Sequence, residues 1–204
     1  MQNTPEERLR VSYEVISDRA QWYLNHSAIV PPSVSQGKPF HNIPRLRLWD
    51  DAMDFGTEAE PTTLTVFELP SDGDERGPVV REAVWQRTRD LRRLQELVCQ
   101  STRAVWFEPT MAVRDAPVPA PELNALLHEA ASLSVPVVWL DEAVGVTCDV
   151  GTRGFDFFSR DQPPAVLRLE WSQDKPATWG PIVEWFIRVR VFLEGCLAQA
   201  AEDG

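Results

Sequence analysis

The sequence lacks any long apolar run. No stretch of about 18 to 20 apolar residues, the length that a membrane-spanning helix needs, occurs among its 204 residues. The N-terminal stretch "MQNTPEERLR" also lacks the basic and apolar regions of a secretory signal. These two absences predict a cytoplasmic protein with no membrane partner.

Cysteine is scarce, and the motifs of common catalytic sites are missing. The three cysteines, Cys99, Cys148 and Cys196, lie far apart and form no CxxC pair. An odd number of widely spaced cysteines is not a disulfide framework, so we expect reduced, buried thiols. The sequence contains no GxSxG, HExxH, P-loop or GxGxxG pattern. No cofactor and no motif-bound metal is therefore predicted.

Positive charge is also in short supply. The chain has 20 basic and 31 acidic residues, which gives a formal net charge of −11. A field of this sign repels nucleic-acid phosphate and attracts a basic protein, so we expect a protein partner, basic in charge, and no nucleic acid. Only Lys38 and Lys175 are lysines, and the arginine bias, together with abundant alanine and proline, indicates a bacterium with a high-GC genome.

Apolar and aromatic residues are plentiful. They include eight tryptophans and nine phenylalanines, and 43% of the chain is hydrophobic. A chain of this size and composition can bury one large core, so we expect a single domain over residues 1–204. Its expected parts are an N-terminal helix (1–26) with Thr4 as its cap, a long loop (27–62) with one short strand at "RLRLW", a β-α-β-α-β core (63–142), a β extension (143–172) and a C-terminal helix (180–201).

The middle of the chain alternates between strand-like and helix-like patterns. Three apolar stretches, "TLTVFEL", "RAVWF" and "VPVVWL", are typical of buried strands, and helical patterns at 79–100 and 122–134 separate them. This order is typical of right-handed crossovers onto parallel strands. The predicted fold class is α/β, with a mainly parallel central sheet of about three crossover-connected strands, antiparallel strands that extend it, and helices on both faces.

Acidic residues follow each of these predicted strands. They are Glu68, Glu108, Asp141 and Glu142. The carboxyl ends of parallel strands meet at one edge of a sheet, where clustered carboxylates can bind Mg²⁺. This predicts an alternative function, a Mg-dependent hydrolase or phosphoryl-transfer enzyme, in which Glu68, Glu108 and Asp141 are catalytic and Glu108, Asp141 and Glu142 bind the metal. The other interpretation is that these carboxylates are solvated strand ends or helix caps.

Two further clusters are candidates for contact with a partner. One predicted helix carries five arginines, among them Arg89 and Arg93, which form either a docking surface for an acidic partner or a solvated face. The stretch "WSQDKPATWGP" places Asp174 between Trp171 and Trp179. Tryptophan is enriched at interfaces, but a strand that ends at Trp171 and a helix that starts after Trp179 explain this stretch equally well.

The function predicted from these observations is protein binding without catalysis. The apolar last helix after "LRLEW", the acidic charge and the missing catalytic motifs give the chain a general resemblance to bacterial immunity proteins. The resemblance implies a toxin-neutralising or conflict-system component inside a bacterium. The candidate partner-binding residues are Trp171, Asp174, Trp179, Arg89 and Arg93.

Overall fold

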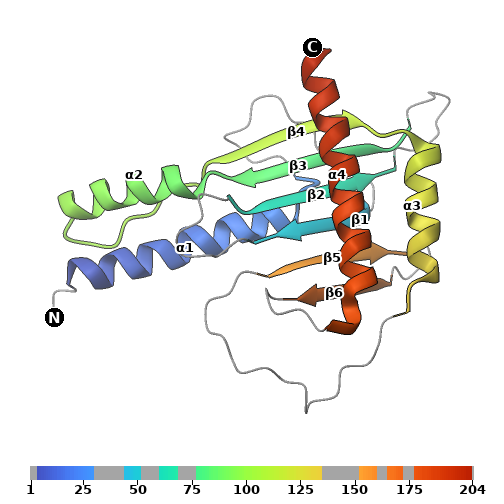
Figure 1. Cartoon of the computed structure of the whole chain (residues 1–204). Helices are drawn as coiled ribbons and strands as arrows, with labels where there is room; N and C mark the ends of the chain where they lie inside the picture. Colours follow the sequence, from blue (N-terminus) through green and yellow to red (C-terminus); the bar gives the residue numbers. More distant parts are fainter. Residues whose placement is uncertain are drawn as a thin grey trace.

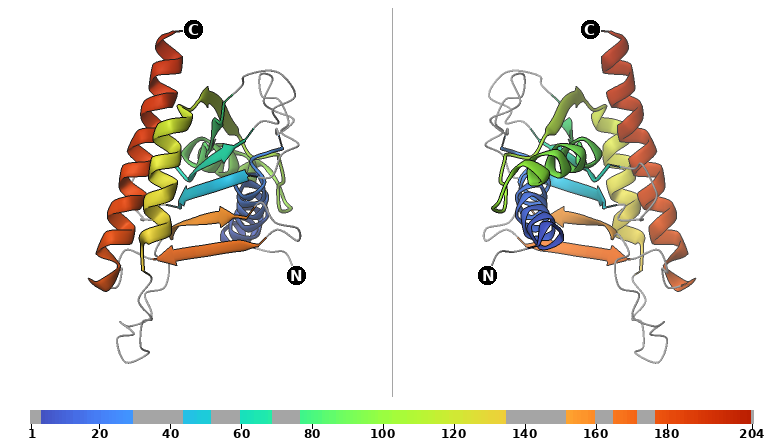
Figure 2. Two further views of the ribbon diagram at one scale, coloured as in Figure 1. Left: turned by 90° about the vertical axis from the view of Figure 1, so that its right-hand side faces the viewer. Right: turned by 90° about the vertical axis from the view of Figure 1, so that its left-hand side faces the viewer.

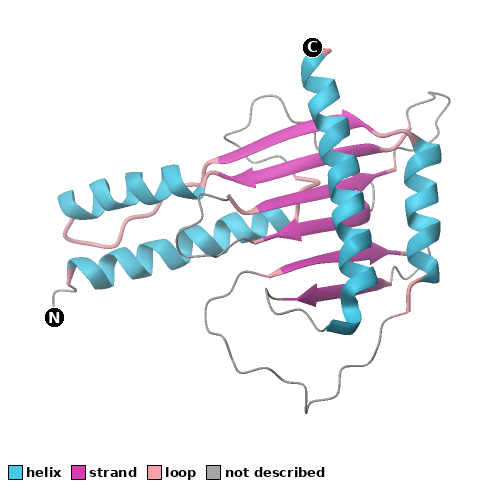
Figure 3. Ribbon diagram, in the orientation of Figure 1, coloured by secondary structure: helices cyan, strands magenta, loops and turns pink. Residues whose placement is uncertain are grey.

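A computed structural model describes the chain from residue 4 to residue 203, except for 30–43, 52–59, 69–76, 135–151, 160–164 and 172–176. The described residues form an α/β fold in which a six-stranded sheet carries helices on both faces (Figures 1 and 3). Every pair of neighbouring strands in this sheet is antiparallel. The predicted mainly parallel sheet is therefore wrong.

The elements follow one another along the chain with these bounds. The helices are α1 (Pro5–Asn25), α2 (Arg87–Gln100), α3 (Ala120–Ser132) and α4 (Gly180–Glu202), and a 3-10 turn (Ala177–Trp179) precedes α4. The strands are β1 (Pro44–Asp50), β2 (Thr62–Phe67), β3 (Val79–Trp85), β4 (Met111–Pro117), β5 (Arg153–Phe158) and β6 (Val166–Trp171), and their order in the sheet is β4-β3-β2-β1-β5-β6. No described helix is both long enough and apolar enough to cross a bilayer.

The start of α1 agrees with its sequence pattern. Thr4 is the N-cap, and its side chain accepts a hydrogen bond from the backbone N–H of Glu7 at 3.3 Å. Pro5 occupies the first helical position, where its missing N–H has no partner to lose. Local sequence is sufficient here because a helix start depends on neighbouring residues alone.

The error in the predicted fold begins at β3. Its sequence "VVREAVW" fits helical spacing as well as alternation, and the sequence prediction assigns it to a helix over 79–100. In the structure the side chains alternate: Val80 packs in the core beneath α4, while Arg81 binds the end of α1 on the opposite face. Valine and tryptophan favour the extended conformation, and α2 begins only after this strand.

The connection from β3 to β4 is as long as a crossover between parallel strands, but it joins two antiparallel strands. Helix α2 leads away from the sheet, and residues 101–110 return beside α1, so that β4 begins with Met111 opposite Trp85 (Figure 1). Asp90, 2% exposed, ties the two ends together. It accepts hydrogen bonds from Trp85 Nε1 at 2.9 Å, Thr110 N at 2.7 Å and Thr110 Oγ1 at 2.6 Å. The predicted strand "RAVWF" belongs to this return segment (residues 101–110) and pairs with no strand of the described sheet.

Two cores lie on the two faces of the sheet. Helices α3 and α4 cover one face, and α1 lies against the other with α2 beside it (Figure 2). The core beneath α4 includes Leu46, Leu48, Leu64, Val66, Phe155, Trp185 and Leu193. The core beneath α1 and α2 includes Ile16, Ala20, Ala83, Trp85, Leu94 and Phe107.

The two described cysteines are free thiols. Cys99 is exposed on α2, which contradicts the expectation that the thiols are buried, whereas Cys196 is half-buried on α4. Desolvation raises the pKa of the Cys196 thiol. Cys148 lies outside the described residues.

The sheet face toward α1 carries a row of polar side chains that crosses all six strands. Each member stands opposite the next across a pair of strands. The row runs, from β4 to β6, through Asp115, Arg81, Thr65, Arg47, Asp156 and Arg168. Opposite charges are neighbours at both of its ends, so the row is electrostatically paired. We call it the polar row.

Each ion pair of the polar row has at least one buried member. Arg81, whose side chain is 0% exposed, donates from Nε and Nη2 to the two carboxylate oxygens of Asp115, each at 2.7 Å. Asp156, also 0% exposed, binds Arg47 and accepts from Arg168 at 2.9 and 3.2 Å. A buried guanidinium or carboxylate is tolerated because such partners replace the lost water.

The polar row also holds the C-terminal end of α1. Arg81 Nη1 donates to the carbonyl oxygen of Ser27 at 3.0 Å, and Arg47 donates to that of Asn25. The hydroxyls of Ser27 and Thr65 lie 2.6 Å apart. The last turn of α1 has no basic residue, and the two sheet arginines, bound at its last residue and just beyond it, oppose the negative end of the helix.

Replacement of Arg81 tests the polar row. We expect Arg81→Leu to lower the free energy of unfolding by about 3 kcal/mol or more, because the Asp115 carboxylate and the Ser27 carbonyl lose their donors. The double variant Arg81→Leu/Asp115→Leu should recover part of this loss, since no unpaired carboxylate remains. Urea unfolding of the wild type and both variants measures the difference. Equal losses in the two variants would contradict the pairing.

Gly154 of β5 is required by the close approach of Trp49. A Cβ at this position would lie 2.9 Å from Trp49 Cε2 and closer still to the backbone oxygen of Leu169. Neither neighbour can give way easily, because one is a half-buried indole and the other is part of the β5–β6 ladder.

We therefore expect Gly154→Ala to destabilise the protein by about 1 to 3 kcal/mol, as overpacking does. The matched control is Gly195→Ala within α4, where an added Cβ meets nothing within 4 Å. The control should stabilise by about 0.5 to 1 kcal/mol because alanine is the better helix former. Melting temperatures of the two variants compare them directly, and shifts of the same sign would refute the packing argument.

Candidate protein-binding surface

The two described carboxylates of the predicted enzyme site are each held by an arginine. Glu68, just after β2, is paired with Arg45 of β1. Glu108, in the return segment, accepts hydrogen bonds from Arg19 Nε at 3.5 Å and from the Tyr23 hydroxyl at 3.3 Å. Burial and the charge of Glu108 raise the pKa of Tyr23. Both carboxylates are thus parts of ion pairs between structural elements.

Glu68 and Glu108 were grouped on the expectation that the strands are parallel and end at one edge of the sheet. The strands are antiparallel, so this expectation fails. Glu68 follows the end of β2 that pairs with the start of β3, whereas Glu108 precedes the start of β4, which pairs with the end of β3. The two ends of this seven-residue strand are roughly 20 Å apart at about 3.3 Å per residue. The expected meeting of strand ends at one edge is therefore wrong for Glu68 and Glu108.

The remaining members of the predicted metal site, Asp141 and Glu142, lie outside the described residues. Within the part of the chain that the structure describes, no group of three or more histidines, cysteines, aspartates or glutamates could hold a metal ion.

The two tryptophans proposed for partner contact take part in the core beneath α4. Trp171 ends β6, is 7% exposed and packs edge-on against Phe186 with ring centroids 5.0 Å apart. Trp179 directly precedes α4 and packs against the same core. The interpretation as a strand end and a helix start is the correct one, and Trp171 is not available to a partner. Asp174 lies outside the described residues.

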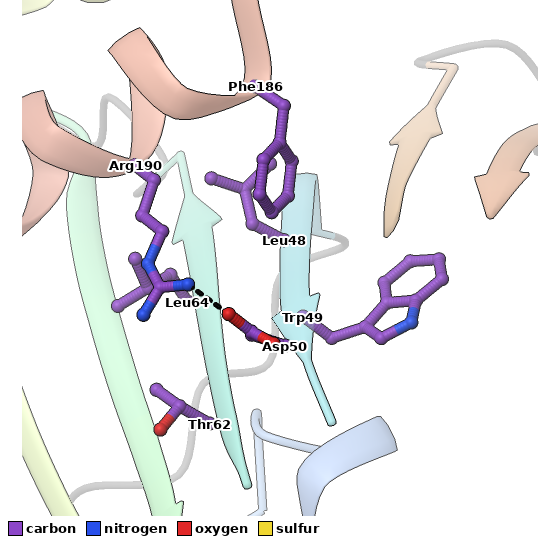
Figure 4. A pocket seen from close by; sticks show the side chains of 7 residues that line it. All are labelled: Leu48, Trp49, Asp50, Thr62, Leu64, Phe186 and Arg190. Carbon is purple, nitrogen blue, oxygen red and sulfur yellow. Dashed lines mark hydrogen bonds and ion pairs between the residues drawn. The ribbon is translucent and has the colours of Figure 1, made fainter. Parts of the chain in front are cut away.

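A small cavity beneath α4 is too confined to be a binding site. It measures about 10 Å³, roughly the space of one water. Asp50 of β1 closes it by an ion pair with Arg190 of α4, beside Phe186 (Figure 4). This contact fixes α4 on the sheet.

The arginines of α2 line an open groove at the end of β3. Its volume is about 640 Å³, and it is open to solvent. The groove is lined by Glu60, Val84, Gln86, Thr88, Arg89, Arg92, Arg93 and Glu96. We call this region the arginine groove. It contains both arginines that the sequence singles out, Arg89 and Arg93.

The guanidinium groups of the arginine groove differ in how firmly they are held. Arg93 lies over the ring of Phe107, with 4.3 Å from Cζ to the ring centroid. Arg89 Nη1 donates to Gln86 Oε1 at 3.2 Å. Arg92 is exposed and has no hydrogen-bond or ionic partner among the described residues. The groove therefore offers donors that are pre-positioned and one cation that is free.

The acidic residues of the groove leave this positive charge in excess. Glu60 accepts hydrogen bonds from the backbone N–H groups of Arg87 at 2.6 Å and Thr88 at 3.1 Å, so its carboxylate caps the start of α2. A carboxylate at this end of a helix is stabilised by the helix dipole. Glu96 is the second carboxylate, set against the three arginines of the lining.

Arg92 is one of the five arginines of the predicted docking helix, but only Arg89 and Arg93 of that cluster were named as candidate partner-binding residues. Its signal was present, since Arg89, Arg92, Arg93 and Glu96 follow the i, i+3, i+4, i+7 spacing of one helix face. The predicted helix over 79–100 also included Arg81, which in the structure belongs to β3 and not to this helix face. Glu60 had no local signal, because the helix that it caps begins 27 residues later.

The comparisons with known proteins found no similar protein. No protein-family model, no curated protein and no solved structure matches this chain. The groove must therefore be interpreted from its own geometry and charge.

Asp51, which follows β1, has an unfavourable environment for its charge. Burial raises the pKa of this carboxyl group, the positive charge of Arg87 opposes the rise, and the nearby charges of Asp50 and Glu170 add to it. Since the folded-state pKa lies above the unfolded one, protonation of Asp51 stabilises the fold below the unfolded pKa. This stabilisation is lost as the pH rises through the folded pKa.

We therefore expect Asp51→Asn to be more stable than the wild type at pH 7, with a difference that closes as the pH falls below the ordinary range of aspartate. Glu184→Gln, on the exposed surface of α4, is the control for losing one negative charge from an acidic chain. Urea midpoints between pH 3 and pH 8 measure the effect. A gain no larger than that of the control at neutral pH would rule out the burial effect.

Proposed function

We propose that this chain is a non-enzymatic protein-binding protein of the bacterial cytoplasm, and that it engages an acidic segment of its partner through the arginine groove. The observation that carries the proposal is the gathering of Arg89, Arg92 and Arg93 at one open groove in a chain of net charge −11. The groove is positive whereas the whole molecule is negative. An acidic segment is therefore attracted to the groove and repelled by the rest of the surface, which favours a specific contact.

The geometry of the groove suits carboxylates of a polypeptide. Guanidinium groups bind carboxylates through paired hydrogen bonds, and Arg93 is already ordered against Phe107. The groove is open along one face of α2, whereas small-molecule sites enclose most of their ligand. An extended or helical acidic segment can lie along such a face, with Val84 as an apolar contact at its end.

The acidic charge of the whole molecule favours a partner that is basic outside the acidic segment bound by the arginine groove. The net charge of −11 attracts a basic body and speeds encounter with it, while the groove selects a local acidic segment. Neutralisation of a toxin, or another conflict-system role, is the biological setting that we propose for this binding. Its support is the acidic charge and the absence of catalytic motifs from the sequence.

Binding of a defined peptide tests the groove. We expect a fluorescein-labelled, glutamate-rich dodecapeptide to bind the protein, and its glutamine analogue to bind far more weakly. Arg92→Gln should raise the dissociation constant of the glutamate peptide about tenfold or more, because a charged hydrogen bond is lost. Arg188→Gln removes the same charge from α4, where Arg188 pairs with Glu129, and should change the dissociation constant little. Fluorescence anisotropy at several salt concentrations provides these constants.

Three results would overturn the proposal. They are equal affinity for the glutamate and glutamine peptides, equal effects of Arg92→Gln and Arg188→Gln, or binding of a phosphopeptide where the glutamate peptide does not bind. The last result would assign the groove to phosphate.

A further inference from the structure

The side of α4 that points away from the sheet is apolar and exposed. Ile187 is 51% exposed and Val191 is 61% exposed, and their four-residue spacing places them on one helix face. Gly195 and Ala198, both exposed, continue this face toward the C-terminal end of the helix. Figure 2 shows α4 and α3 as the outermost layer on their side of the sheet. We call these four residues the outer face of α4.

Exposure of the outer face is unusual for a helix as apolar as α4. A helix that is apolar on all sides is normally buried on all sides. The inner side of α4 agrees, since Trp185, Val189 and Leu193 are 0% exposed in the core beneath α4. Exposed apolar residues that adjoin one another on one face indicate a contact with another molecule, whereas scattered ones do not.

The unpaired charges beside the outer face are acidic. Glu184 stands one turn before the face and Glu202 one turn after it, and both are exposed. Neither has an ionic partner among the described residues. The basic residues nearby are already paired: Arg188 binds Glu129 of α3, and Arg190 binds Asp50 of β1 and Glu194. The apolar face therefore has a free carboxylate at each end.

The C-terminal end of α4 lacks the positive charge that a helix end favours. The last turn contains no basic residue, and Glu202 is followed by Asp203 at the C-cap. Because the carbonyl end of a helix carries partial negative charge, both carboxylates are unfavourably placed. A cation from another molecule would relieve this repulsion.

We infer that the outer face of α4 binds an amphipathic helix of a second protein, in which an apolar stripe is flanked at both ends by lysine or arginine. The stripe packs on Ile187 and Val191, and the basic ends pair with Glu184 and Glu202. These two glutamates are 18 residues apart, about 27 Å at 1.5 Å per residue, which fixes the spacing of the basic groups. Gly195 has no side chain, so the two helices approach closely there.

The same charges argue against a second copy of this chain as the occupant. In an antiparallel two-fold pair centred on the outer face, Glu184 would lie against Glu202 of the partner subunit. In a parallel pair each glutamate would lie beside its own copy. Both arrangements bring like charges together, whereas a basic helix neutralises them.

The inference goes beyond the proposed function, because no residue of the outer face lines the arginine groove. The probe is a fluorescein-labelled helical peptide of about 25 residues, with leucine at i, i+3, i+4, i+7 spacing in its middle and lysines at both ends. A second peptide carries glutamate in place of lysine. Fluorescence anisotropy should show binding of the lysine peptide and far weaker binding of the glutamate peptide.

Variants of the outer face test where the lysine peptide binds. Ile187→Ser/Val191→Ser should raise its dissociation constant about tenfold or more, because the apolar area that the peptide covers is reduced. Val166→Ser on β6, where the valine is 53% exposed, is the matched control and should change it little. Glu202→Gln should also weaken binding and reduce its salt dependence. Glu170→Gln, exposed on β6, is the control for that charge.

Gly195→Gln separates binding from stability. An added Cβ there meets nothing within 4 Å, and glutamine is a better helix former than glycine, so the melting temperature should rise. The same side chain blocks the close approach of a second helix, so the dissociation constant should rise about tenfold. A variant that is more stable and binds as well as the wild type would contradict the inference.

Arg92→Gln, which tests the arginine groove, should leave binding of the lysine peptide unchanged, so the two proposals can fail separately. Four further results would overturn the inference. They are equal affinity for the two peptides, equal effects of the outer-face and β6 variants, loss of binding in Arg92→Gln, or a wild-type dimer that Ile187→Ser/Val191→Ser dissociates in sedimentation velocity. The last result would assign the outer face to a second copy of the chain.

Discussion

The hydrogen bonds between the polar row and the end of α1 are the contact on which the rest of the structure depends. Arg81 and Arg47 are buried in the sheet, and each binds a carboxylate on one side and a carbonyl of the α1 terminus on the other. A buried guanidinium that loses one of these partners is costly, so α1 has one stable position. The same row specifies the strand register, because a slip by one residue would turn its charges into the apolar core beneath α4.

The placement of α1 determines which surfaces remain for binding. With its C-terminal end bound to the sheet, α1 supports the return segment through Ser12, Arg19 and Tyr23. The return segment and Asp90 then hold α2 beyond the end of the sheet, with its arginines outward. The arginine groove thus rests on one set of buried polar contacts. Arg89 and Arg93 are ordered by neighbours, which is how a binding surface gains affinity without deep burial.

The candidate sites show where sequence reasoning succeeds and fails. The arginine cluster was recognisable because i, i+3, i+4 spacing places Arg89 and Arg93 on one helix face in any fold. The carboxylate site was not, because the grouping of Glu68 with Glu108 required parallel strands. The structure shows that Trp171 is buried. The sequence could not show this, because no local pattern separates an exposed indole in a loop from one that ends a buried strand. Trp106 shows the converse, since "RAVWF" resembles a buried strand but its tryptophan is 58% exposed.

The sequence alone determined the properties that depend on near neighbours or on totals. These are the acidic charge, the start of α1 at its Thr4 cap, the strand at "RLRLW" and the α/β composition. Only the tertiary structure decided the direction of the strands and the partners of the buried charges. "VVREAVW" is compatible with a helix until Arg81 meets Asp115 and Ser27, and the 86–110 connection is compatible with a crossover until Asp90 joins its two ends. The physical reason is that these choices are settled by contacts between residues distant in the chain, whose energies no local pattern contains.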